Sequence, residues 1–256
     1  MATLPNPLPK LAGDPSGRSL GLQLPPGVLL DATEDGPWHE PLLWYAGRSA
    51  ARGNWAALGA AGARVGLLPV LIDLGGEQGG PEDWELLPGE MSYAGDHDAE
   101  AVLAEFWEEL AAEGEEWPGL ADRRSPTVDP AVRAAEVADS LTGSPTWFRK
   151  PHLALVPARR SADIPAAIGW AGPVNHENDV ARLCAVLRSW EDRFGIRVVA
   201  LGFDQLVVSV AAPPATLAEA EAVAAEHFAF CPDDIGDLKA YAAKLIGEQA
   251  WHFWWD

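Results

Sequence analysis

Apolar positions recur at helical spacing in six segments of the chain. The clearest segment runs from Asp179 to Gly195, where Val180, Leu183, Leu187, Trp190 and Phe194 follow one another at intervals of three or four residues. Start and stop residues support these helices: Thr216 stands three residues before Glu219, as in a capping box, and a glycine follows several of the stripes. The pattern predicts helices near residues 55–66, 96–114, 129–143, 179–195, 216–230 and 235–247.

Short apolar runs bounded by turn residues predict strands near residues 27–32, 66–74, 152–158, 196–203, 206–211 and 251–256. Pro69 lies inside the second run, which indicates an edge position or a bulge. In the last run, WHFWWD, strand alternation places Trp251, Phe253 and Trp255 on one face and Trp254 on the other. We expect the first three rings to pack on helices, so that removing the six residues unfolds the C-terminal half.

The order of elements after residue 150 is strand, helix, strand, strand, helix, helix, strand. With one helix as an insertion, this order predicts an α+β domain of the ferredoxin-like split β-α-β type over 151–256, with an antiparallel-rich sheet and helices on one face. A smaller α/β lobe (21–114) would pack against it, after a loose segment (1–20) and before a linker with one helix (115–150).

Several C-terminal strands carry apolar residues on both faces. In RVVALGF (197–203), Val199 and Leu201 point to one face while Val198 and Ala200 point to the other. A sheet with one open face should instead alternate apolar and polar residues. We therefore expect the second face to be covered, by the chain's own N-terminal half or by a partner chain.

The formal net charge of −20, from 38 acidic and 18 basic residues, bounds the kinds of partner. Such a surface repels nucleic-acid phosphates and anionic lipid, so neither nucleic acid nor membrane is an expected partner. It suits a basic protein partner, and solubility is the simpler explanation. Two cysteines, Cys184 and Cys231, make no disulfide framework, and no secretion signal is visible, so we expect a cytoplasmic protein.

Candidate catalytic residues gather where the helix near 216–230 ends. His227 and Cys231 are four residues apart and Asp233 follows, so a histidine–cysteine pair could act as base and nucleophile. Pro232 indicates, however, that the helix ends at Cys231. A packed histidine and a buried cysteine are the simpler interpretation.

Arg160, Ser161 and Asp163 form the candidate ligand-binding group, since arginine grips carboxylates and phosphates in bidentate fashion. The alternative is an ion pair with Asp163 or with the segment WEDRF (190–194). The polar helix starts at 96–98 and 175–180 could hold a metal, although helix caps are the simpler interpretation of both. We expect neither metal nor cofactor, because phosphate-loop and zinc-protease motifs are absent.

Four phrases in the C-terminal half, VPARRSADIPAAIGWAGPVN, LRSWEDRFGIRVVALGFD, AAEHFAFCPDDI and the closing FWWD, together resemble the domain of unknown function 4253 family. The resemblance covers about residues 150–256, and the N-terminal half resembles the segment that precedes that domain in longer members. It implies a bacterial, cytoplasmic α+β protein and supplies no activity or catalytic residues. The segment CPDDIGDLKAY (231–241) is shorter than the family pattern.

Three functions remain open on this basis. The first is a non-catalytic module that binds a protein, with immunity to a toxin as one version and with Trp254 and Trp170 as contact residues. The second is a small-ligand enzyme, a hydrolase or transferase, that uses Arg160 with His227 or Asp233. The third is a structural homodimer subunit that buries its sheet face; monomer and homodimer both fit the sequence.

Overall fold

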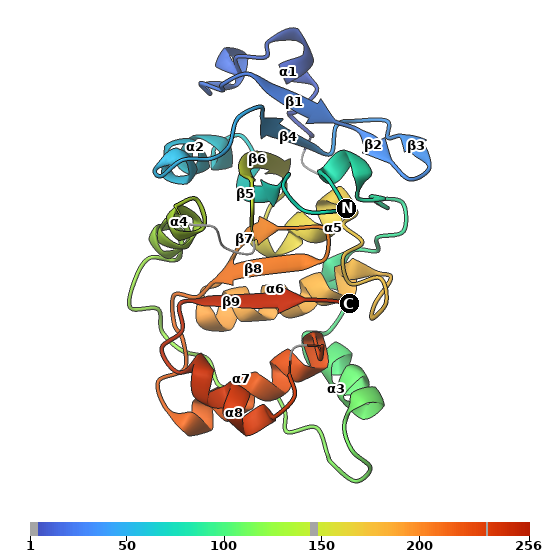
Figure 1. Ribbon diagram of the computed structural model, residues 1–256, viewed down its shortest axis with the longest axis vertical. Helices are drawn as coiled ribbons and strands as arrows, with labels where there is room; N and C mark the ends of the chain where they lie inside the picture. The colour runs from blue at the N-terminus through green and yellow to red at the C-terminus, as the bar shows by residue number, and fades with distance from the viewer. Residues whose placement is uncertain (1–4, 144–147, 234) are drawn as a thin grey trace.

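A computed structural model describes residues 5–143, 148–233 and 235–256, and its main element is a seven-stranded mixed sheet (Figure 1). The strands of this sheet are β1 (Gly27–Leu30), β4 (Leu43–Ala46), β5 (Leu67–Asp73), β6 (Pro151–Pro157), β7 (Arg197–Leu201), β8 (Gln205–Ser209) and β9 (Ala250–Trp254). Their order across the sheet is β1-β4-β6-β5-β7-β8-β9. Two further short strands, β2 (Ala32–Thr33) and β3 (Gly36–Pro37), pair with each other. The fold is therefore α+β, as expected.

Strand β5 joins the two halves of the chain. It pairs antiparallel with β6 along its whole length and parallel with β7 at Leu71 and Ile72. A strand of the N-terminal half thus lies between two strands of the C-terminal half, and the remaining neighbours in the sheet pair antiparallel. The expected ferredoxin-like split β-α-β domain over 151–256 is not what this order shows. The order of strands and helices along the chain does not reveal that β5, which lies outside residues 151–256, enters the sheet between β6 and β7.

Pro69 lies in this central strand, although the sequence suggested an edge or a bulge. The residue pairs with Leu155 of β6, and the pairing with β7 begins only at Leu71. Because proline has no amide N–H, it fits a strand where one side lacks a partner. β5 is central at its C-terminal end and one-sided at Pro69, which accommodates the ring.

Helices cover both faces of the sheet. The α-helices are α1 (Lys10–Gly13), α2 (Asn54–Ala63), α3 (Ala99–Leu110), α4 (Pro130–Leu141), α5 (Ile164–Ile168), α6 (Val180–Phe194), α7 (Leu217–Phe230) and α8 (Leu238–Leu245). The larger core joins α3, α5, α6, α7 and α8 to one face, and a second core joins α2 and α4 to the other. The C-terminal helices α5 to α8 thus all pack on one face, as expected for residues 151–256, and the helices on the other face, α2 and α4, come from outside that range.

The second face of the sheet is covered by other parts of the same chain, which is one of the two alternatives expected from the sequence. Val199 and Val207 of the sheet lie in one cluster with Trp55 of α2 and with Val137 and Leu141 of α4. The cover reaches Ala250 at the start of β9, whereas His252 is exposed and Trp254 is half-buried. In Figure 1, α4 stands to the left of these strands and α6 lies behind them.

Helix ends follow the sequence signals. Asp129 accepts hydrogen bonds from the amides of Ala131 and Val132 at the start of α4, and Thr216 and Glu219 form the expected capping box of α7. Gly195 ends α6 with φ at 65°, a left-handed conformation that favours glycine. Strand β4 and the short helices α1 and α5 were not expected from the sequence.

The segment 1–20, expected to be loose, is held against the sheet where the structure describes it. Leu8 and Leu11 are buried in a cluster with Trp44 of β4 and Leu155 of β6. Residues 1–4 lie outside the described residues. Proline and glycine content suggested a flexible tail, but two well-placed leucines are enough to fix this short segment on the sheet.

Candidate functional site

The closing strand β9 shows the expected alternation. Trp251, Phe253 and Trp255 are 1%, 2% and 1% exposed, whereas His252 is exposed and Trp254 is half-buried. Trp251 and Phe253 each lie 5.5 Å from Trp190 of α6 between ring centroids, and Trp255 lies 5.5 Å from Phe230 of α7. The ending is therefore a central part of the larger core, and His252 and Trp254 lie on the other face of the strand.

Trp254 is fixed in place by its neighbours. Its indole N–H donates to Oδ2 of Asp204 at 2.9 Å, and its carbonyl accepts a hydrogen bond from Sγ of Cys231 at 3.0 Å. Two residues later, the amide of Asp256 donates to Asp233 at 3.1 Å, and the carbonyl of Asp256 accepts from Asn175 at 2.6 Å. The structure thus brings Trp254, Cys231 and Asp233 together at one end of β9.

Asp204 was not singled out by the sequence, which showed it only as half of a two-residue turn. Asp204 accepts from the Trp254 indole, and Asp233 accepts from the amide of Asp256 two residues further along, so three aspartates lie near the end of β9. None of the ion pairs among the described residues involves any of the three. The end of β9 therefore combines a half-buried indole with three aspartates that form no ion pair among the described residues.

Trp170, the second expected contact residue, has the position of a core residue. It is 1% exposed, and its indole N–H donates to the carbonyls of Gly202 and Phe203 at 2.9 Å each. Its ring stands edge-on to Trp255 with centroids 5.6 Å apart. The Trp170 side chain therefore supports the end of β9, the strand that contains Trp254.

His227 lies in an aromatic enclosure and is completely buried. Its ring centroid is 4.5 to 5.8 Å from the rings of Trp251, Phe253, Trp190 and Tyr241. Nδ1 hydrogen-bonds with the hydroxyl of Tyr241 at 2.9 Å, and Nε2 has no hydrogen-bond partner among the described residues. Burial lowers the pKa of His227 to about 3, so the imidazole is neutral and closed off from solvent.

The expected ligand-binding residues all form hydrogen bonds with other residues of the protein. Arg160 donates to Asp192 at 2.6 Å and to the carbonyl of Arg188 at 3.2 Å, which is the alternative ion pair with the WEDRF segment. Asp163 receives two hydrogen bonds from Arg188, at 2.5 and 2.9 Å. Ser161 is 7% exposed, and its hydroxyl accepts from the amide of Val198.

Arg160 and His227 do not share a pocket. Arg160 binds Arg188 and Asp192, which lie one turn apart on α6. His227 packs on Trp190, which points about 200° around the helix from residue 188. The enzyme expected from Arg160 with His227 is therefore not assembled by this fold.

The two polar helix starts meet in space. His97 Nε2 is 3.8 Å from Oδ2 of Asp179, and the amide of Ser92 donates to Oδ1 of Asp179 at 3.1 Å. Asp98 and Asp179 accept from amides in the first turns of α3 and α6, as caps do. Across residues 5–143, 148–233 and 235–256, no group of three or more histidine, cysteine or acidic side chains could hold a metal ion.

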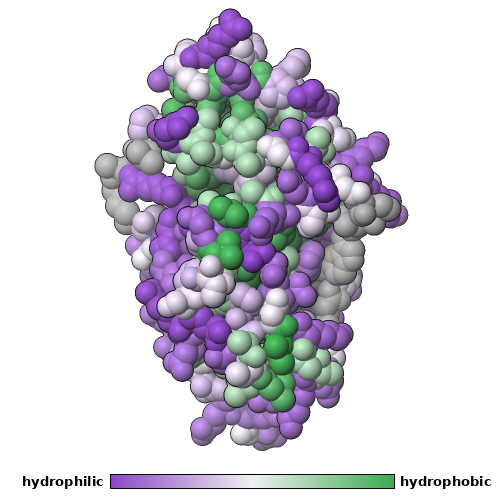
Figure 2. All heavy atoms as spheres, turned by 90° about the vertical axis from the view of Figure 1, so that its left-hand side faces the viewer, coloured by the Kyte–Doolittle hydropathy of each residue, from purple (hydrophilic) through white to green (hydrophobic). Residues whose placement is uncertain are grey.

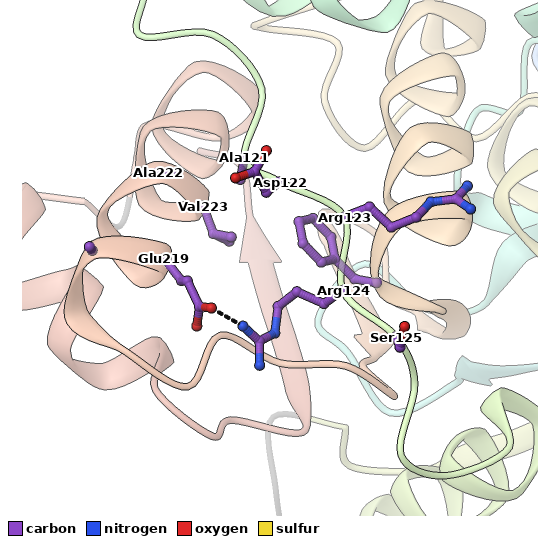
Figure 3. A pocket seen from close by; sticks show the side chains of 10 residues that line it. Ala121, Asp122, Arg123, Arg124, Ser125, Glu219, Ala222 and Val223 are labelled. Carbon is purple, nitrogen blue, oxygen red and sulfur yellow. Dashed lines mark ion pairs between the residues drawn. The ribbon is translucent and has the colours of Figure 1, made fainter.

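A groove of about 670 Å³ lies between the segment 121–125 and the start of α7 (Figure 3). Phe194, Ala222 and Val223 form its apolar floor, and the ion pair of Arg124 with Glu219 spans it. Arg123 points away from the groove, whereas Asp122 also lines it. The groove therefore holds one paired and one further acidic group beside its apolar floor, and no arrangement of groups that indicates a particular ligand.

Beside this groove, Glu226 forms a buried ionic network that the sequence did not reveal. Glu226 is completely buried and accepts from both terminal nitrogens of Arg193, from the indole of Trp190 at 2.7 Å and from the amide of Ala121 at 2.7 Å. In the sequence, Glu226 lies outside the apolar stripe of α7, so the spacing of apolar residues does not indicate that it is buried. The network fastens the segment before α4 to α6 and α7.

The C-terminal part of the chain, which contains most of these features, matches a protein family. Residues 152–256 match the family Domain of unknown function (DUF4253). The resemblance drawn from the sequence is thereby confirmed for the C-terminal part of the chain. No curated protein and no solved structure matches the chain. The DUF4253 region contains β6 to β9 and α5 to α8, and it therefore includes Trp254, Asp204, Asp233 and Asp256.

Proposed function

We propose that this protein binds a basic protein partner, with Trp254 at the end of β9 as the anchoring residue. The observation that carries the proposal is the half-exposed Trp254 ring, held by Asp204 near the end of β9, where the amide of Asp256 donates to Asp233. The ion pairs among the described residues involve none of these three aspartates. A lysine or arginine of the partner would stack on the indole face and meet these carboxylates. The net charge of −20 supports the same direction, because it raises the local concentration of cationic partners.

A homodimer through the sheet face has less support. α2 and α4 already occupy the second face over β7 and β8. Figure 2 shows the side of the molecule on the left of Figure 1, and its hydrophobic residues lie in separate patches among hydrophilic ones. Among the described residues, the exposed large hydrophobic side chains are Val28, Tyr93, Val132, Val174, Leu217 and Ile246. Their scatter does not favour a large apolar contact.

Immunity to a basic toxin is a specific version of the proposal, set in the cytoplasm. Cys184 and Cys231 are both buried thiols, which suits a reducing compartment. No helix among the described residues has the length and apolarity needed to cross a membrane. A toxin gene beside the gene for this chain, with a basic product that binds it, would support this version.

The test uses a fluorescent peptide of alternating arginine and glycine and its glutamate counterpart, with anisotropy as the readout. The arginine peptide should bind more tightly, and its Kd should rise with salt. Trp254→Ala should weaken binding about fivefold, which corresponds to about 1 kcal/mol. Trp38→Ala is the matched control, because Trp38 is also half-buried and lies in the N-terminal half. Equal binding of both peptides, or no effect of Trp254→Ala, would overturn the proposal.

A further inference from the structure

Ser49 and His152 form a hydrogen-bonded pair far from the end of β9. Ser49 follows β4, and His152 is the second residue of β6, the strand that pairs with β4. The pairing of these strands brings together residues 103 positions apart, with Oγ of Ser49 3.4 Å from Nε2 of His152. Nucleophile and base pairs often show such loose contacts in the absence of substrate.

The second ring nitrogen of His152 fixes which nitrogen carries the proton. Nδ1 lies 2.7 Å from the carbonyl oxygen of Ala46. A carbonyl oxygen can only accept a hydrogen bond, so Nδ1 of the neutral ring bears the hydrogen. Nε2 then presents its lone pair to the Ser49 hydroxyl. This is the tautomer that a general base needs, with a third group orienting the ring.

The two side chains differ in exposure in the way that such a pair requires. His152 is 9% exposed, whereas Ser49 is exposed. The amide of Ala50 donates to the carbonyl of Pro151 at 2.7 Å and thereby holds the serine segment beside β6. The hydroxyl is accessible to a substrate, while the base is shielded by the protein.

A second serine–histidine pair in the chain provides a comparison. Ser92 Oγ lies 2.6 Å from Nε2 of His97, and the same Nε2 lies 3.8 Å from the Asp179 carboxylate. A carboxylate beside Nε2 favours a proton on that nitrogen. Nε2 of His97 is then a donor to Ser92, not a base for it. Ser92 and His97 thus match the first pair in residue type and differ from it in chemistry.

We propose that Ser49 and His152 are a nucleophile and general base that cleave activated carboxylic esters. Ser49 Oγ attacks the carbonyl carbon and its proton passes to Nε2 of His152. The bond to the leaving oxygen breaks, and this oxygen takes the proton from Nε2, which leaves an acyl group on Ser49. Water then attacks the acyl carbon, gives its proton to Nε2, and Ser49 recovers that proton as the carboxylic acid departs.

The test combines a fluorophosphonate probe, located by peptide mass spectrometry, with hydrolysis of p-nitrophenyl acetate. The adduct should form on Ser49, and Ser49→Ala should abolish both the adduct and the enzymatic part of hydrolysis. Ser92→Ala, the matched control, should change neither. His152→Ala should slow labelling by about 100-fold or more, the usual contribution of a general base.

If His152→Ala fails to fold, the pH dependence of wild-type labelling replaces it. Labelling should then decline on acidification, because a protonated imidazole cannot accept the serine proton. An adduct elsewhere, no adduct at all, or labelling that does not vary with pH would overturn the proposal. These outcomes are independent of the arginine-peptide assay, so the two proposals can fail separately.

Discussion

Trp254 and Asp204 are joined by a 2.9 Å hydrogen bond from the indole N–H to the carboxylate, beside the turn between β7 and β8. We expect Asp204→Ala to lower the free energy of unfolding by about 1 kcal/mol, the usual contribution of one hydrogen bond. A double-mutant cycle with Trp254→Phe, which keeps a ring and removes the N–H, isolates this contribution in urea unfolding. Strictly additive effects of the two substitutions would show that the bond contributes nothing to stability.

The buried face of β9 should be indispensable for folding. Phe253 is 2% exposed and contacts Trp190, His227 and Phe230, so Phe253→Ala should cost about 3–5 kcal/mol in urea unfolding. Removal of residues 251–256 should abolish the near-ultraviolet circular dichroism of the C-terminal half. His252→Gln serves as control on the exposed face of the same strand and should have a small effect. A truncated chain with an unchanged Tm would contradict this expectation.

Local features of the fold could be predicted because they depend on nearby residues. The capping box of Thr216 and Glu219, the Asp129 cap and the facing of Trp251, Phe253 and Trp255 all follow from spacing within one element. The place of β5 between β6 and β7 could not be predicted in this way, because strand pairing depends on the whole arrangement of the chain. Sequence order alone favoured a C-terminal sheet complete in itself.

The candidate site was predictable to a similar degree. Trp254 was expected on the second face because alternation dictates it, whereas the approach of Asp204 depends on pairing between β8 and β9. Ser49 and His152 meet only through the pairing of β4 with β6, and β4 itself was not expected. Arg160 and Asp163 have the right chemistry for a ligand, but α6 supplies internal partners for both.

Glu226 should be the most sensitive charged position in the larger core. Glu226→Ala leaves Arg193, the Trp190 indole and the Ala121 amide without their common acceptor, and it should cost about 3–5 kcal/mol in urea unfolding. Proteolysis within 115–128 should become faster, because Ala121 loses its anchor. Glu221→Ala, at an exposed position of the same helix, should change the free energy of unfolding by less than about 0.5 kcal/mol. Similar costs for the two variants would refute this role of Glu226.

His227 should make the folded state sensitive to acid. Its pKa is about 3 in the folded protein, because burial disfavours the charged ring, against 6.5 for an ordinary histidine. The unfolded state therefore binds more protons between these values. The stabilising contribution of His227 is complete above pH 6.5 and is lost as the pH falls from 6.5 toward 3.

The measurement is the free energy of unfolding in urea at pH 7, 6, 5 and 4, in wild type and in the double variant His227→Phe, Tyr241→Phe, which removes the histidine together with its hydroxyl partner. The double variant should lose less stability over this range than wild type, whereas His39→Gln, at an exposed histidine, should follow the wild-type curve. Parallel curves for wild type and the double variant would mean that acid acts through other groups, since His227 would then contribute no difference in proton binding between the folded and unfolded states.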